Sequence, residues 1–105
     1  MELMTKEIEE RLEQIGLFPE IEDMHEAEVI VKYFNPCGAG TWLVVGGERY
    51  GDDWELYGYA NIGYEWEWGS IMLSELEAYR SPLLIGIERD LYCAGKCVRE
   101  LANIC

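Results

Sequence analysis

The spacing of apolar residues near the start of the chain predicts a helix. Ile8 and Leu12 lie four residues apart within residues 5–15, and this spacing brings side chains to one face of an α-helix. Thr5 is a suitable N-cap, because its hydroxyl can accept a hydrogen bond from a backbone N–H of the first turn. Gly16 is a natural end, because glycine tolerates the left-handed backbone that often follows a helix.

The pattern then changes to short runs rich in β-branched and aromatic residues, which predict strands. Glycine, asparagine and aspartate separate several of these runs, so we expect neighbouring strands to form an antiparallel meander. The glycine pair at residues 46–47 is expected to close the second strand. The predicted strands are residues 27–34, 41–45, 54–60, 64–72 and 83–92.

Two more helices complete the predicted fold. Ser74 and Glu77 have the spacing of a capping box, in which each side chain bonds the backbone N–H of the other residue, so a short helix is expected to begin there. Residues 97–105 predict a terminal helix. Runs of strands without regular βαβ alternation indicate the α+β class. The length of 105 residues suits a single domain over residues 1–105, with the helices packed on one face of the sheet.

Strands 54–60 and 64–72 carry much of the aromatic and acidic content of the chain. Side chains alternate between the two faces of a strand, so each strand divides its residues into two sets. Burial of the apolar set stabilises a fold by about 25 cal/mol per Å², and the expected core residues are Trp54, Tyr64, Trp66 and Trp68. The set expected on or beside one solvent face consists of Asp52, Asp53, Glu55, Tyr57, Tyr59, Glu65 and Glu67.

The charge balance limits the classes of partner. Twenty-one acidic residues oppose eight basic ones, which gives a formal net charge of −13. Nucleic acids and anionic membranes are poor partners, because binding to phosphates requires Lys and Arg. A basic protein surface is the natural partner, although solubility alone also accounts for such a charge. The N-terminus does not resemble a signal peptide and no apolar run approaches a membrane span, so we expect a cytoplasmic protein with reduced cysteines.

Several motifs together resemble a known family. They are GDDW at residues 51–54, LSELE at 73–77 and GIERDLY at 86–92, with LMTKEI and VKYFNPCG upstream. In this order they resemble a family of small acidic bacterial proteins of unknown function, whose members occur on plasmids, conjugative elements and phages. The resemblance covers nearly the whole chain and brings no activity, cofactor or catalytic residue to carry over. It implies a setting in mobile DNA, where small acidic proteins often act against host defence.

Two groups of acidic residues are also compatible with metal binding or catalysis. Asp52 and Asp53 have the oxygen ligands that hard cations take, but Gly-Asp-Asp before a strand is typical of a turn. Glu88 and Asp90, with Arg89 between them, resemble part of a nuclease site, but no third ligand accompanies them. Arg89 could pair with a buried carboxylate and organise the core, or it could contact a partner.

The cysteines and the histidine can also be explained either by a functional role or by a purely structural one. Cys93 and Cys97 have a spacing that a zinc site admits, and a helix would align them with Cys105, but buried reduced thiols are the preferred explanation because a second close pair of ligands is missing. The CAGKC tail and Cys105 lie outside the motifs that carry the family resemblance, and Cys105 is a candidate exposed thiol. His25 lies among acids in a loop, where a charge-balancing role is expected.

These observations lead to a hypothesis about function. We expect a non-enzymatic inhibitor whose carboxylates imitate nucleic acid and occupy a basic groove of a defence protein, without a metal or other cofactor. The expected partner-binding residues are the seven of the solvent face together with Glu88 and Asp90. The alternatives are a small metal-dependent enzyme that acts on nucleic acid and an adaptor for a plasmid or phage protein.

Overall fold

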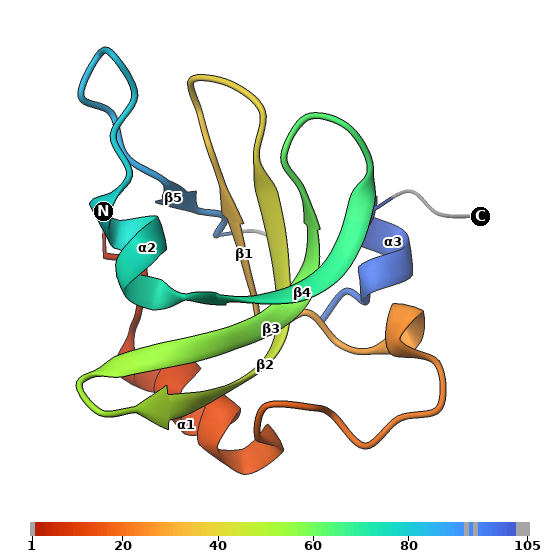
Figure 1. The fold of residues 1–105 in the computed structure, drawn as a ribbon. Coiled ribbons are helices and arrows are strands. Elements are labelled where there is room, and N and C mark those ends of the chain that lie inside the picture. The colour runs from red at the N-terminus through yellow and green to blue at the C-terminus, as the bar shows by residue number, and fades with distance from the viewer. Residues whose placement is uncertain (1, 92, 94, 103–105) are drawn as a thin grey trace.

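A five-stranded antiparallel sheet forms the centre of the computed structural model, which describes residues 2–91, 93 and 95–102 (Figure 1). The strand order is β4-β3-β2-β1-β5, so the first four strands form a meander and the fifth lies beside β1. The α+β class predicted from the runs of strands is confirmed. The strands are β1 (Val31–Phe34), β2 (Thr41–Tyr50), β3 (Asp53–Asn61), β4 (Trp66–Met72) and β5 (Glu88–Arg89).

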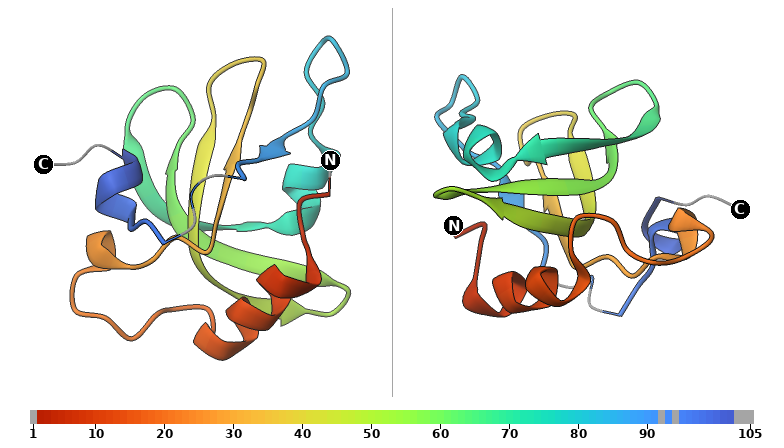
Figure 2. Two further views of the ribbon diagram at one scale, coloured as in Figure 1. Left: turned by 180° about the vertical axis from the view of Figure 1, so that it is seen from behind. Right: turned by 60° about the horizontal axis from the view of Figure 1, so that its bottom comes forward.

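Short helices flank the sheet. The first has the caps that the sequence predicts, because the hydroxyl of Thr5 accepts a hydrogen bond from the N–H of Ile8 at 3.2 Å and Gly16 has a φ of 84°. Figure 2 shows η1 beside α3, at a distance from α1. The end of the predicted terminal helix, residues 103–105, lies outside the described residues. The helices are α1 (Lys6–Ile15), the 3-10 helix η1 (Met24–Glu26), α2 (Leu73–Ala78) and α3 (Val98–Ala102).

The hydrophobic core has two parts, one on each face of the sheet. On the first face, α1 contributes Leu12 and α2 contributes Leu76 to a cluster that includes the sheet residue Leu56. On the second face, Val98 of α3 packs in a cluster with Leu43 of β2. The expectation that all helices cover one face is therefore wrong, because both faces of β2 carry large apolar side chains that must be removed from water.

β2 continues past the glycine pair that was expected to close it. Gly46 and Gly47 lie inside the strand, after a register shift between Val44 and Gly46. A Cβ on Gly46 would lie 2.2 Å from the carbonyl oxygen of Leu17, so glycine allows the segment after α1 to approach the strand closely. The N–H of Gly47 also donates to the carbonyl oxygen of Gly16 at 2.8 Å. The two glycines thus hold the end of α1 against β2.

The predicted strand 83–92 is wrong except at β5. Among the described residues of this range, Glu88 and Arg89 form the only strand. The preceding loop turns at Leu84, whose φ of 62° does not fit a strand. The buried hydroxyl of Ser81 accepts hydrogen bonds from two later backbone N–H groups of this loop, both at 3.2 Å. An apolar run resembles a strand in sequence, but the contacts of Ser81 bend it into a turn.

The predicted capping box of the second helix is also wrong. α2 begins at Leu73, and Glu75 rather than Glu77 reaches back to accept a hydrogen bond from the N–H of Met72 at 3.2 Å. Ser74 lies within the first turn, because a carboxylate from another part of the chain binds its polar groups.

That carboxylate belongs to Asp53, at the start of β3. The hydroxyl of Ser74 donates to one carboxylate oxygen at 2.5 Å, and the N–H of Ser74 donates to the other at 3.1 Å. The N–H of Trp54 donates to that second oxygen at 2.7 Å. These bonds, with the Ser74 hydroxyl as the largest cause, hold the pKa of Asp53 below its usual value. Asp53 therefore links the β2–β3 turn to α2.

The low pKa of Asp53 predicts a contribution to stability that acid removes. A carboxylate whose pKa is lower in the folded state stabilises the fold above its unfolded pKa of 3.8, and this contribution is lost as the pH falls through the folded pKa. We expect Asp53→Asn to lower the free energy of unfolding at pH 7, and we expect its difference from wild type to shrink below pH 3.8. Urea unfolding followed by tryptophan fluorescence measures both values.

The neighbouring Asp52 supplies the control for this measurement. Asp52→Asn removes the same charge from an exposed turn position, so it should change the free energy of unfolding little at either pH. A difference between wild type and Asp53→Asn that stays constant into strong acid would contradict the role given to the Asp53 carboxylate.

A second link joins the N-terminal segment to the sheet. Tyr33 is fully buried in β1, and its hydroxyl donates to the carbonyl oxygen of Leu3 at 2.6 Å. Burial raises the pKa of Tyr33, so the phenol remains a neutral donor. We expect Tyr33→Phe to lower the free energy of unfolding by about 1–3 kcal/mol, because a buried carbonyl loses its partner. Urea unfolding measures the change, and Tyr64→Phe, at a side chain that is 94% exposed, should have little effect.

Candidate functional site

Two glycines face each other where β3 and β4 pair. The register places Gly58 opposite Gly69, and Val44 of β2 lies opposite Gly58 on its other side. A Cβ on Gly58 would lie 2.1 Å from the carbonyl oxygen of Leu43, so the close approach of β2 and β3 requires glycine there. A Cβ on Gly69 would meet no atom within 4 Å. The pair therefore leaves open space on this face of β4.

Larger side chains around the glycine pair turn this space into a groove. Leu56 and Ile71 form the next cross-strand pair on the same face. The groove has a volume of about 480 Å³, which falls in the range of roughly 300–1,000 Å³ that is common for binding sites. Trp42 of β2 and Ile62 and Tyr64 of the β3–β4 loop complete its apolar lining.

The rim of this groove is acidic. Glu65 and Glu67, both predicted to bind a partner, line it and are exposed. No Lys, Arg or His lines the groove within the described part of the chain. The same charge continues along the chain, because residues 50–79 contain seven acids and no basic residue. This segment includes β3, β4 and α2, so the acids of these three elements have no basic residue near them in the sequence.

β4 also forms one edge of the sheet (Figure 1). In the part of the chain that the structure describes, this strand pairs with β3 alone, over Trp66–Met72. An edge strand directs alternate backbone N–H and C=O groups away from the sheet, where another strand can bind them. The groove and the free edge thus belong to the same strand.

The opposite face of β3 and β4 is aromatic. Tyr57 stacks on Trp68 with ring centroids 5.7 Å apart, and Tyr59 stacks on Trp66 at 5.2 Å. The β3–β4 loop joins Asn61 to its partner Trp66, so an odd-numbered residue of β3 always lies opposite an even-numbered residue of β4. The predicted division of these strands, with the two tryptophans and the two tyrosines on opposite faces, is therefore wrong.

The acidic array expected on this hairpin does not form for the same reason. Glu55 lies on the aromatic face, whereas Glu67 lies opposite Ala60 on the groove face. Trp54 is in the core as predicted, with 3% of its surface exposed. Tyr64, expected in the core, is exposed in the loop instead. Glu55, Glu65 and Glu67 are consequently not one contiguous surface.

His25 covers part of the aromatic face. Its ring lies edge-on to that of Trp68, with centroids 5.5 Å apart, and its Nδ1 atom lies 3.3 Å from a carboxylate oxygen of Asp23. Arg99 of α3 pairs with Asp23 at 3.0 Å and with Glu26 at 2.6 Å. The histidine lies beside an acid, as predicted, and these contacts join η1 to α3.

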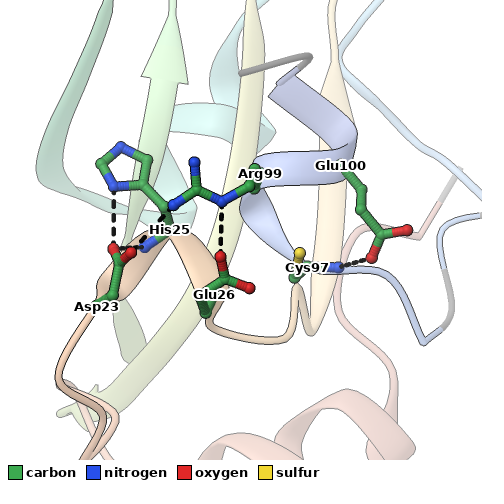
Figure 3. Close-up of polar contacts among 6 residues, drawn as sticks. All are labelled: Asp23, His25, Glu26, Cys97, Arg99 and Glu100. Carbon is green, nitrogen blue, oxygen red and sulfur yellow. Dashed lines mark hydrogen bonds and ion pairs between the residues drawn. The ribbon is translucent and has the colours of Figure 1, made fainter. Parts of the chain in front are cut away.

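Two carboxylates at η1 and α3, those of Asp23 and Glu100, have a lowered pKa. The backbone N–H of His25 is the largest cause of the lowered pKa of Asp23. Glu100 also has a lowered pKa, because the N–H of Cys97 donates to it at 3.2 Å (Figure 3). Each carboxylate bonds a backbone N–H of its own segment, so the contacts support loop and helix geometry.

The remaining predicted site residues lie at the opposite edge of the sheet. Glu88, Arg89 and Asp90 belong to β5 or follow it directly, on the far side of β1 from β2. Asp90 pairs with Lys32 at 3.5 Å, and Nε of Arg89 donates to the carbonyl oxygen of Glu2 at 3.1 Å. These residues are therefore separated by the width of the sheet from the acids at the groove.

Cys93 and Cys97 do not share a helix, because α3 begins at Val98. Cys93 is buried before the start of α3, Cys97 is partly buried, and Cys37 is exposed; all three are free thiols. Cys105 lies outside the described residues. Within the described ranges, no group of three His, Cys, Asp or Glu side chains is arranged to hold a metal ion. No described helix has the length and apolar character needed to span a membrane.

The fold and the groove define a small acidic α+β protein with an apolar groove at one sheet edge. The family model described as "Protein of unknown function (DUF2958)" matches residues 3–102, so the chain belongs to this family. Membership of a family of unknown function, predicted from the motifs, is thereby confirmed. Neither the search of curated proteins nor the search of solved structures found a match to the chain.

The sequence did not predict the groove, because the centre of the groove consists of glycines, which have no side chains. Gly58 and Gly69 each interrupt a predicted strand, and glycine inside a strand often marks a close backbone approach or a bulge. That signal identifies unusual positions, but it does not show that the two glycines lie opposite each other.

Proposed function

We propose that the protein is a non-enzymatic acidic inhibitor that occupies the basic nucleic-acid-binding groove of a bacterial defence complex. The observation that carries this proposal is the segregation of charge, because residues 50–79 combine seven acids with no basic residue. A groove that binds phosphates carries the complementary charge. The choice of a defence complex follows from the mobile-DNA setting that the family resemblance implies.

The surroundings of the groove add apolar contact to this electrostatic attraction. Ile62 is 65% exposed and Tyr64 is also exposed, and both lie beside the acidic rim. Protein interfaces commonly combine an apolar centre with a polar rim, and tyrosine is enriched in them. Charge at the rim would accelerate the encounter with a basic partner, and apolar contact would slow dissociation. The two features together support a protein partner.

Two triple variants that lose the same amount of negative charge at different places on the molecule test the proposal. One triple variant carries Gln at Glu65, Glu67 and Glu77, and the other carries Gln at Glu7, Glu10 and Glu22. All six are exposed, and none has an ion pair among the described residues. Both variants have a net charge of −13 + 3 = −10.

The assay measures inhibition of DNA cleavage by a purified CRISPR effector nuclease and by a restriction nuclease. We expect the first triple variant to need about tenfold more protein for half inhibition, corresponding to about 1.4 kcal/mol. The control triple should differ from wild type by less than about twofold, and inhibition should weaken as salt rises. Equal effects of the two triples would show that total charge, not its placement, governs binding. Failure of the wild type to inhibit either nuclease would count against a defence nuclease as the partner.

A further inference from the structure

β4 combines two features of a strand-addition site. Along Trp66–Met72 it is an edge strand whose described partner lies on one side only. The groove opens over Gly69, in the middle of this same strand. When a peptide adds to a sheet edge, backbone hydrogen bonds contribute affinity and pockets for alternate side chains contribute specificity. The edge and the groove therefore lie where one extended segment can use both.

The residues of β4 indicate which side chains such a segment should carry. Residues two apart on a strand share a face, so an added strand would place successive alternate side chains beside Ile71, Gly69 and Glu67. The open space at Gly69 accepts a large apolar side chain, and an aromatic ring commonly covers a glycine on the neighbouring strand. The carboxylates of Glu67 and Glu65 favour Lys or Arg in the adjoining rows.

A second copy of this chain is a poorer occupant of the edge. Each copy carries a net charge of −13, so two copies repel each other. Charged residues on an edge strand commonly prevent pairing with a similar strand. Here Glu65 and Glu67 are both negative, and no basic residue lines the groove in the described chain. The β4 edge therefore disfavours pairing with a second copy of this chain and favours pairing with a basic strand.

We infer that β4 binds an extended segment of a basic protein as an added strand, with an apolar side chain over Gly69 and basic side chains beside Glu67 and Glu65. The inference rests on the proposed function and specifies how the partner is held. A nucleic acid lacks both the backbone that pairs with a strand and the positive charge that the rim attracts.

The direct test uses two synthetic peptides. In LTFTKTK, antiparallel addition places Leu beside Ile71, Phe beside Gly69 and Lys beside both acids; KTKTFTL has the order required for parallel addition. At low salt, calorimetry should show saturable binding of at least one peptide. Hydrogen exchange should show slower exchange of backbone amides within residues 66–72. The acidic peptides LTFTETE and ETETFTL should bind at least about tenfold more weakly. If neither basic peptide binds, the inference is wrong.

A matched pair of protein variants tests the groove. In Gly69→Trp the new ring enters open space and fills the groove, whereas Ser70→Trp adds the same bulk to the next residue, on the opposite face. We expect the first variant to weaken peptide binding by about tenfold or more and the second by less than about threefold. Thermal unfolding of both variants shows whether they remain folded. Equal weakening by two folded variants would overturn the assignment to the groove.

N-methylated peptides test the backbone pairing. One form of the binding peptide is methylated at its threonine amides, and the other at the intervening amides. An added strand donates only one of these two sets to β4, so one form should lose binding while the other retains it. If both methylated peptides still bind, strand addition is wrong. The inference is also wrong if sedimentation shows a dimer that Gly69→Trp dissociates, because a second copy of the chain would then occupy the edge.

The two proposals fail in different ways. If the Glu65, Glu67 and Glu77 triple loses nuclease inhibition but Gly69→Trp does not, strand addition is wrong and the acidic inhibitor remains supported. If a basic peptide binds in the way described and neither nuclease is inhibited, the docking site is supported and the partner is a basic protein of another kind.

Discussion

The pairing of β3 with β4 is the constraint on which the surface of this protein depends. Register decides which side chains share a face, and a slip of one residue would exchange the two faces of a strand. Gly58 lies opposite Gly69, which opens the groove on one face. On the other face the same register brings Tyr57 onto Trp68, where Phe18 and His25 of the segment between α1 and β1 cover them. The groove and the aromatic cluster are two consequences of one alignment.

The placement of the basic residues decides where negative charge remains. Arg11, Arg49 and Arg99 form ion pairs with acids of α1, the segment between α1 and β1, or η1. Exposed pairs of this kind contribute about 0–1 kcal/mol each, so they are weak determinants of stability. They offset part of the negative charge of residues 1–28, which contain ten acids and two basic residues, while residues 50–79 contain no basic residue at all. The proposed binding face is therefore acidic because the counter-charges lie elsewhere.

Predictions from sequence succeeded where the responsible interactions are local. The helix at Lys6–Ile15 follows from its apolar period and from Thr5, because a cap and its hydrogen bond lie within one turn. The capping box failed because Asp53 binds Ser74 from 21 residues away. Of the acids expected on one solvent face, Glu65 and Glu67 line the groove, but Glu55 lies on the opposite face, because the register between the strands was not known from the sequence.

The sequence by itself determined the α+β class, the main strands, the family and the excess of acids, because these depend on local patterns and composition. Only the tertiary structure decided that Trp66 faces Tyr59 and that Gly69 borders an open groove on a free edge. The physical reason is that the length of a loop and the approach of two backbones set the register between strands. Alternation along one strand separates its two faces, but it does not show which face of the neighbouring strand each one joins.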